Sequence, residues 1–141
     1  MPKMDTVETR LREALERHDD VLVAYLFGST ARGTAGPLSD IDVAVLLQDD
    51  GDPLERQLDL VGEVSSAIGS DRVDVILLNE APIALAYRVL RDGRLILSRD
   101  ERARIQHRVS TVDRYLDMEP FRRVQAQGLR RRIREGRFGR P

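Results

Sequence analysis

The stretch FGSTARGTAGPLSDIDVAV, residues 27–45, decides the expected fold and site. It begins where an apolar run of strand-forming residues, 21–27, is ended by Gly28 and Ser29. Glycine at a strand-to-helix turn lets backbone N–H groups approach an anion, and the N-terminus of a following helix favours negative charge. Ser29 can donate its hydroxyl to a phosphate oxygen, and Arg32 can add a charge-assisted bond. This half of the stretch predicts a phosphate-binding turn.

The second half of the stretch carries two carboxylates. Asp40 and Asp42 stand two residues apart in a predicted strand over residues 40–47, so both project from the same face. Their Cα atoms are then roughly 7 Å apart, which lets both carboxylates converge on one or two metal ions. The alternating residues are apolar and are expected to face the core: Ile41, Val43 and Val45.

A third carboxylate, Asp74, interrupts the apolar run over residues 72–78. A strand rich in Val, Ile and Leu is typical of a central, buried position, where a lone aspartate is costly unless it is paired or metal-bound. If this strand lies beside residues 40–47, three carboxylates cluster. Pairing of Asp74 with Arg72 or Arg94 is the alternative.

The composition limits which metal such a cluster can hold. The chain has 141 residues, enough for one compact domain, and it contains no cysteine. Its two histidines, His18 and His107, are far apart in sequence. Thiolate zinc sites and histidine-rich sites are therefore excluded, and carboxylates alone favour a hard cation such as Mg²⁺. No apolar run approaches the roughly 20 residues that span a membrane, so we expect a cytoplasmic protein without membrane contact.

Charge is unevenly distributed along the chain. Residues 121–141 hold eight arginines and one acid, Glu135, so this tail carries +7 and the other 120 residues −8 of a net −1. The tail is a disordered charged segment, a contact to an acidic partner surface, or a contact to RNA phosphates. Phe138 is its one aromatic residue beyond Phe121, which is little for base stacking, so RNA ranks last.

Hydrophobic periodicity predicts alternating helices and strands. Helices are expected over residues 5–17, 53–68, 82–90 and 101–118, and strands over 21–27, 40–47, 72–78 and 95–97. The apolar faces of two helices are expected to be Leu54, Leu58, Val61, Val64 and Ile68, and Ile105, Val109, Val112 and Leu116. The pattern predicts an α/β (α+β) fold, a small mixed sheet flanked by helices. Residues 1–98 would form the core, 99–120 a C-terminal helix packed on it, and 121–141 a basic tail.

The spacing of these motifs resembles that of the nucleotidyltransferase superfamily of DNA polymerase β. There, Gly-Ser is followed by ten residues, Asp-x-Asp and a third aspartate on a later strand, and residues 28–42 and Asp74 match this pattern. The fuller form, Gly-Ser-x-Ala-Arg-Gly with Ser-Asp-Ile-Asp, is similar to the minimal nucleotidyltransferases, or MNT-domain antitoxins. Residues 90–97 and 115–117 also resemble later parts of those antitoxins. The resemblance covers about residues 5–118 and implies a polymerase β-like fold.

The resemblance also implies a reaction. Asp40, Asp42 and Asp74 would be catalytic and would hold two Mg²⁺ ions, with Mn²⁺ as a substitute. Asp74 would also help to deprotonate the acceptor hydroxyl. The residues implied in nucleotide binding are Gly28, Ser29, Arg32 and Ser39. The MNT antitoxins imply ATP as substrate and AMP transfer to a tyrosine of a HEPN-type RNase toxin, which silences the toxin.

Two other functions remain open at this point. One is a non-catalytic antitoxin that blocks its toxin sterically, although a binding module has no need of clustered acids. The other is a small-molecule nucleotidyltransferase of the aminoglycoside-modifying type. Such enzymes generally carry a further helical domain, and this chain has few residues after the predicted core.

Overall fold

The computed structural model describes residues 4–28, 41–48 and 51–134. The predicted residues Ser29, Arg32, Ser39 and Asp40 lie outside these ranges, as does the helical turn expected after Ser29. The elements are α1 (Met4–Glu16), β1 (Val21–Phe27), β2 (Ile41–Leu47), α2 (Pro53–Ile68), β3 (Val73–Leu77), α3 (Ile83–Asp92), β4 (Arg94–Ser98) and α4 (Glu101–Arg134).

The strands form one mixed sheet in the order β3-β2-β1-β4. β1 pairs antiparallel with β2 and β4, whereas β2 and β3 are parallel. The mixed α/β architecture predicted from sequence is confirmed. The prediction that the strand at residues 72–78 is central is wrong, because β3 is the other edge strand.

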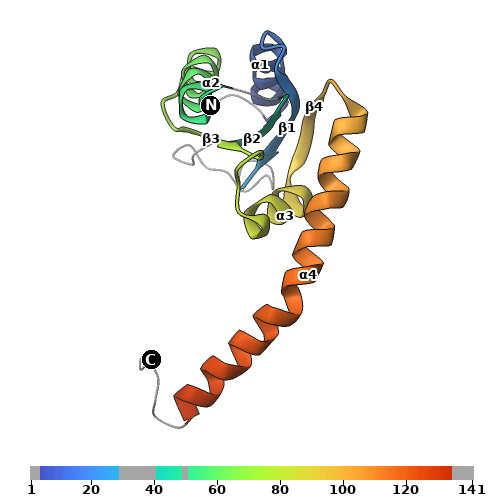
Figure 1. The fold of residues 1–141 in the computed structure, drawn as a ribbon. Helices are drawn as coiled ribbons and strands as arrows, with labels where there is room; N and C mark the ends of the chain where they lie inside the picture. Colours follow the sequence, from blue (N-terminus) through green and yellow to red (C-terminus); the bar gives the residue numbers. More distant parts are fainter. Residues whose placement is uncertain (1–3, 29–40, 49–50, 135–141) are drawn as a thin grey trace.

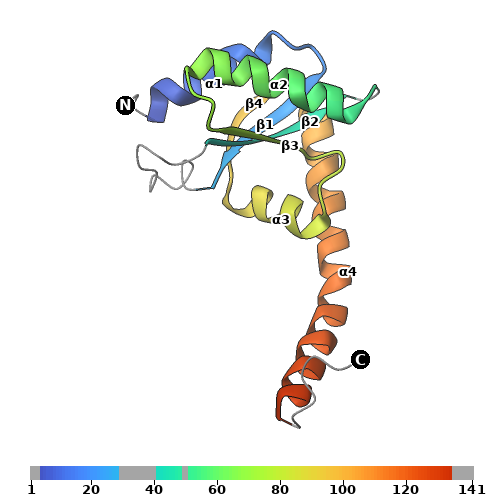
Figure 2. The same cartoon turned by 90° about the vertical axis from the view of Figure 1, so that its left-hand side faces the viewer.

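Helices cover both faces of the sheet. Figures 1 and 2 show α1 and α2 on one face and α3 with the first part of α4 on the other. The larger core lies under α1 and α2, and the strand residues Val43 and Val45 point into it as predicted. The opposite core joins Tyr25 and Ala44 to Ala86 and Val89 of α3. Both faces of β2 are therefore buried over most of its length.

The buried side of α2 differs from the predicted one. Leu60, Val64 and Ile68 are buried, whereas Leu54 and Leu58 are 61% and 63% exposed. Since α2 packs beside α1 and over the edge strand β3, only a narrow stripe of the helix meets the core. The predicted apolar face is therefore wrong in part, because it includes the exposed Leu54 and Leu58 and leaves out the buried Leu60.

Side chains from helices cap a backbone carbonyl on each edge strand. Arg12 of α1 donates its Nε–H to the Ile96 carbonyl of β4 at 2.8 Å. Gln57 of α2 donates its Nε2–H to the Val75 carbonyl of β3 at 2.6 Å. Capped carbonyls make both edges poorer templates for pairing with another strand.

The last helix is longer than predicted and packs by another face. α4 has 34 residues and continues through Pro120, extending away from the body (Figure 1). Thr111 is buried against the core, whereas three residues of the predicted apolar face are exposed: Ile105, Val109 and Leu116. The expectation that this face packs on the core is therefore wrong. None of the helices in the described ranges is long and apolar enough to cross a membrane.

Candidate functional site

Two of the three predicted carboxylates lie side by side. In the parallel pairing of β2 and β3, Asp42 is the register partner of Asp74. The Ile41 N–H donates to the Arg72 carbonyl at 2.8 Å, which fixes this register where both strands begin. Neighbouring strands are roughly 4.8 Å apart, and partners in register project from the same face. The structure therefore brings together two acids that are 32 residues apart in sequence.

Gly28, the residue after β1, lies beside the two aspartates of β2 and β3. Phe27, the last residue of β1, pairs with Asp42, so the next residue, Gly28, lies beside the Asp42 carboxylate. Its φ is +79°, and a Cβ on its backbone would lie 2.5 Å from Asp42 Oδ2. Glycine is required here both for the left-handed backbone and for the space that the carboxylate occupies. We call Gly28, Asp42 and Asp74 the catalytic row, a name that follows the role expected of the two aspartates from the sequence.

The catalytic row lies where the helical cover of the sheet ends. Ala44 and Ile76, the next residues on the same face, pack in the core under α3. Asp42 is half-buried and Asp74 is exposed. The expectation of a buried Asp74 is wrong, because Asp74 lies near the start of β3, beyond the part of this face that the helices cover. Nor does Arg94 serve as its partner, since the Nε of Arg94 lies 3.2 Å from Glu8 Oε1.

An open hollow adjoins the row. It has a volume of about 400 Å³ and is lined by residues 71–74. Its volume is within the range of about 300–1,000 Å³ that is usual for ligand sites, but a lining of four consecutive residues makes it a shallow surface rather than an enclosed pocket. Asp71 adds a further carboxylate that sequence reasoning missed, and its position three residues before Asp74 was the available signal.

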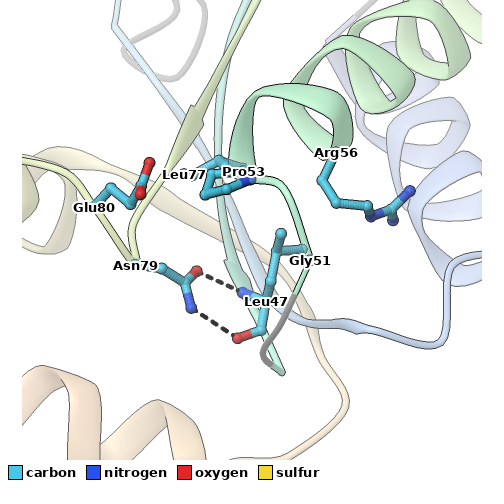
Figure 3. Close-up of a pocket in the computed structure, with 7 residues that line it drawn as sticks. All are labelled: Leu47, Gly51, Pro53, Arg56, Leu77, Asn79 and Glu80. Carbon is cyan, nitrogen blue, oxygen red and sulfur yellow. Dashed lines mark hydrogen bonds between the residues drawn. The ribbon is translucent and has the colours of Figure 1, made fainter.

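A second hollow lies at the opposite ends of β2 and β3 (Figure 3). It has a volume of about 450 Å³ and is lined by Leu47, Gly51, Pro53, Arg56, Leu77, Asn79 and Glu80. The carboxyl ends of parallel strands are the usual ligand position in open α/β sheets. Here, however, the Asn79 amide is already bonded to the Leu47 N–H and carbonyl at 2.8 and 2.9 Å. Arg56 likewise forms two 2.8 Å bonds with Asp20. Two of the polar side chains that line this hollow, Asn79 and Arg56, therefore serve the fold.

The catalytic row suits a hard divalent cation. Asp42 and Asp74 offer oxygen ligands from adjacent strands, and the missing Cβ of Gly28 leaves the space that the Asp42 carboxylate occupies. Within the described ranges, no three metal-ligating side chains gather at one point. Since Asp40 lies outside those ranges, the described pair accounts for two of the three predicted ligands. Ser29, Arg32 and Ser39 are likewise not placed.

Comparison with known proteins defines the class. The model of the family "Polymerase beta, Nucleotidyltransferase" matches residues 9–102, two thirds of the chain. This range includes every residue of the catalytic row. The chain belongs to the polymerase β-type nucleotidyltransferases.

Some of the solved structures that are similar to this chain are of toxin–antitoxin complexes. The chain is 41% identical over 70 residues to the protein adenylyltransferase MntA of Shewanella oneidensis, an alignment that spans about half the length of either protein. It is also similar to a crystal structure of a toxin–antitoxin with AMP-PNP, with 28% identity, a TM-score of 0.75, and 86% of this chain and 97% of that one covered. The MntA–HepT toxin–antitoxin structure matches at 25% identity and a TM-score of 0.70, covering 89% of this chain and 97% of that chain.

Proposed function

We propose that this protein is an antitoxin that transfers AMP from ATP to a tyrosine hydroxyl of a cognate HEPN-type toxin and thereby silences it. The observation that carries the proposal is the catalytic row, in which two carboxylates adjoin a glycine at the ends of three neighbouring strands. A purely steric inhibitor has no use for this arrangement, because two adjacent carboxylates repel unless a cation neutralises them.

In this proposal the three aspartates hold the metal ions and the residues around Gly28 bind the nucleotide. Asp40, Asp42 and Asp74 would hold two Mg²⁺ ions. These ions would neutralise the negative charge of the triphosphate and of the leaving pyrophosphate. The half-buried Asp42 has its position fixed by β2 pairing on both sides. Ser29, Arg32 and Ser39 would bind the nucleotide, together with backbone N–H groups after Gly28.

The exposed Asp74 would act on the acceptor. A general base must come within hydrogen-bond reach of the proton that it abstracts, and an exposed carboxylate on an edge strand is open to a partner's side chain. As the tyrosine oxygen bonds to the α-phosphorus, its proton passes to Asp74. The bond from the α-phosphorus to the bridging oxygen of the β-phosphate breaks, and pyrophosphate leaves.

The relatives support the acceptor and the substrate in this proposal. Transfer to a protein is the activity in the name of the S. oneidensis relative, and the similar solved chains belong to complexes of toxin and antitoxin, one with an ATP analogue. The proposal includes a cytoplasmic location, where ATP is available.

The proposal can be tested with a variant that keeps the shape of the site. Asp42→Asn with Asp74→Asn removes both charges and leaves the core residues on either side untouched. We expect the double variant to stay folded, to bind toxin and to transfer no AMP, so that cells expressing the toxin are no longer protected. Glu80→Gln, which removes one charge at the second hollow, is the matched control and should protect fully. Protection by a folded double variant without detectable transfer would show steric inhibition instead.

A further inference from the structure

The exposed side of α4 carries a row of aliphatic residues. Ile105, Val109 and Leu116 are 51%, 54% and 54% exposed, and Val112 between them is partly buried. Their spacing of four, three and four residues places them along one side of the helix. We call Ile105, Val109, Val112 and Leu116 the α4 stripe. Of the large apolar side chains exposed among the described residues, three belong to it, and the others include the α2 pair Leu54 and Leu58.

The chain's own core does not use the α4 stripe. α4 is held to the body through another side, on which Thr111 is buried and His107 lies 3.4 Å from the Thr111 hydroxyl. On that side, too, Tyr115 stacks on Tyr87 of α3 with ring centroids 3.8 Å apart. Because these contacts fix the rotation of the helix, the stripe stays turned toward solvent. A contiguous exposed apolar patch is typical of a protein interaction site.

The α4 stripe is also separate from the catalytic row. In Figure 2, α4 lies toward the ends of β2 and β3 at which these strands finish, whereas Asp42 and Asp74 lie near their beginnings. β2 has seven residues, a span of roughly 20 Å. A small domain is about 30 Å across, so one partner is wide enough to contact α4 and still present a side chain at the catalytic row.

We propose that the α4 stripe is the surface on which the HEPN-type toxin docks, an inference that rests on the proposed function. The occupant follows from the structural relatives. The match to the toxin–antitoxin with AMP-PNP covers 86% of this chain, about 121 of 141 residues, and only 100 residues precede α4. The matched part therefore includes a considerable portion of α4. The similar chain, which includes this helix, comes from the structure of a toxin–antitoxin. This favours the toxin, rather than a second copy of this chain, as the partner that covers the α4 stripe.

Separate surfaces for docking and for catalysis have a measurable consequence. Docking would depend on the stripe, while nucleotide binding and chemistry would depend on the catalytic row. Charged substitutions on the stripe should then weaken toxin binding and leave ATP binding unchanged. A purely structural role for the stripe would instead lower the stability of the fold and disturb both.

The test uses two matched pairs of exposed aliphatic residues. Val109→Asp with Leu116→Asp changes the stripe, and Leu54→Asp with Leu58→Asp makes the same change on α2. Affinity for the purified cognate HEPN-type toxin is measured by calorimetry, with ATP binding, circular dichroism and light scattering of each variant alone. We expect the stripe variant to bind toxin at least about tenfold more weakly, and the α2 variant within about twofold of wild type.

The outcomes separate the two proposals. Equal toxin affinity in the stripe variant, or a larger loss in the α2 variant, overturns the docking proposal while the proposed function stands. A wild-type dimer that the stripe substitutions dissociate overturns it in favour of a second copy. Wild-type protein that neither binds nor modifies the toxin overturns the proposed function and the docking surface together. If the aspartate pair unfolds the chain, Val109→Ser with Leu116→Ser makes the same comparison without added charge.

Discussion

Replacing Gly28 by alanine perturbs the catalytic row at its most crowded point, and Gly69 supplies a matched control. The two glycines have nearly the same backbone, with φ of +79° and +80°. Alanine in this left-handed region costs about 1–2 kcal/mol at either position. For a domain of this size such a loss lowers the Tm by roughly 3–6 °C. Both variants should therefore be folded and similarly destabilised.

The two positions differ in what the new methyl group meets. At Gly69 nothing lies within 4 Å of the added carbon, whereas at Gly28 it would lie 2.5 Å from Asp42 Oδ2. Ordinary contact begins at 3.4 Å, so the carboxylate has to move by about 1 Å or rotate away. A displacement of that size in a catalytic group can lower a rate by about 10²-fold.

The assay compares AMP transfer to the toxin with thermal stability for both variants. We expect Gly28→Ala to lose transfer by about 10²-fold and Gly69→Ala to keep it within about twofold, at similar Tm. If Gly28→Ala transfers AMP as fast as Gly69→Ala, the carboxylate of Asp42 is not positioned by this glycine and the reasoning is refuted.

Four further outcomes are expected. Excess chelator should abolish transfer, and Mg²⁺ or Mn²⁺ should restore it; full activity in chelator would exclude the metal-dependent chemistry. Asp42→Asn should reduce the transfer rate more than Ser29→Ala, because the serine offers one hydroxyl, on the order of 1–3 kcal/mol, among several backbone donors; the reverse order in kinetics would refute these roles. Asn79→Ala should lower the free energy of unfolding in urea by about 1–3 kcal/mol, since both Leu47 backbone groups lose their partner, and an unchanged midpoint would contradict this. Burial lowers the pKa of His107, so the unfolded chain takes up its proton first as pH falls; the contribution of this group to stability is present above the unfolded pKa and is lost as pH falls through the folded pKa, and His107→Gln should remove that loss from urea midpoints.

The position of β3 shows why part of the site could not be predicted from sequence. The apolar run around Asp74 indicates a strand, and the strand is there. The apolar residues of β3 are buried by α2 on one face of the sheet and by α3 on the other. Helices can cover both faces of an edge strand as well as those of a central strand. The sequence predicted a cluster of carboxylates only if the two strands lie side by side. The parallel pairing of Asp42 with Asp74 meets this condition.

The helix faces illustrate a second limit. In α1 the apolar residues that recur with helical spacing are all buried, because this helix packs on the sheet: Val7, Leu11, Ala14 and Leu15. In α4 periodicity found an apolar row but could not say what the row faces. Tyr115 and Thr111, which fix the rotation of the helix, carry polar groups and give no periodic signal. The row is real, and its exposure made it a candidate interface.

The motif and its spacing predicted the candidate site residues. The geometry of these residues could be predicted only in part. Gly28 was expected to allow close approach of an anion, and the structure adds that it makes room for Asp42. That contact joins residues on adjacent antiparallel strands, so it depends on the register of β1 and β2 rather than on the motif. The division into core, helix and tail at residues 98 and 120 stays a prediction, with α4 crossing the second boundary.

The most direct test of the proposed function is the fate of labelled phosphate. The purified protein is incubated with Mg²⁺, its cognate HEPN toxin and ATP labelled at either the α- or the γ-phosphate, and the toxin is then weighed and sequenced by mass spectrometry. Transfer of AMP predicts that α-label, and no γ-label, appears on a toxin tyrosine with the mass of whole AMP units. A toxin that is silenced with unchanged mass, or that carries γ-label, would contradict it.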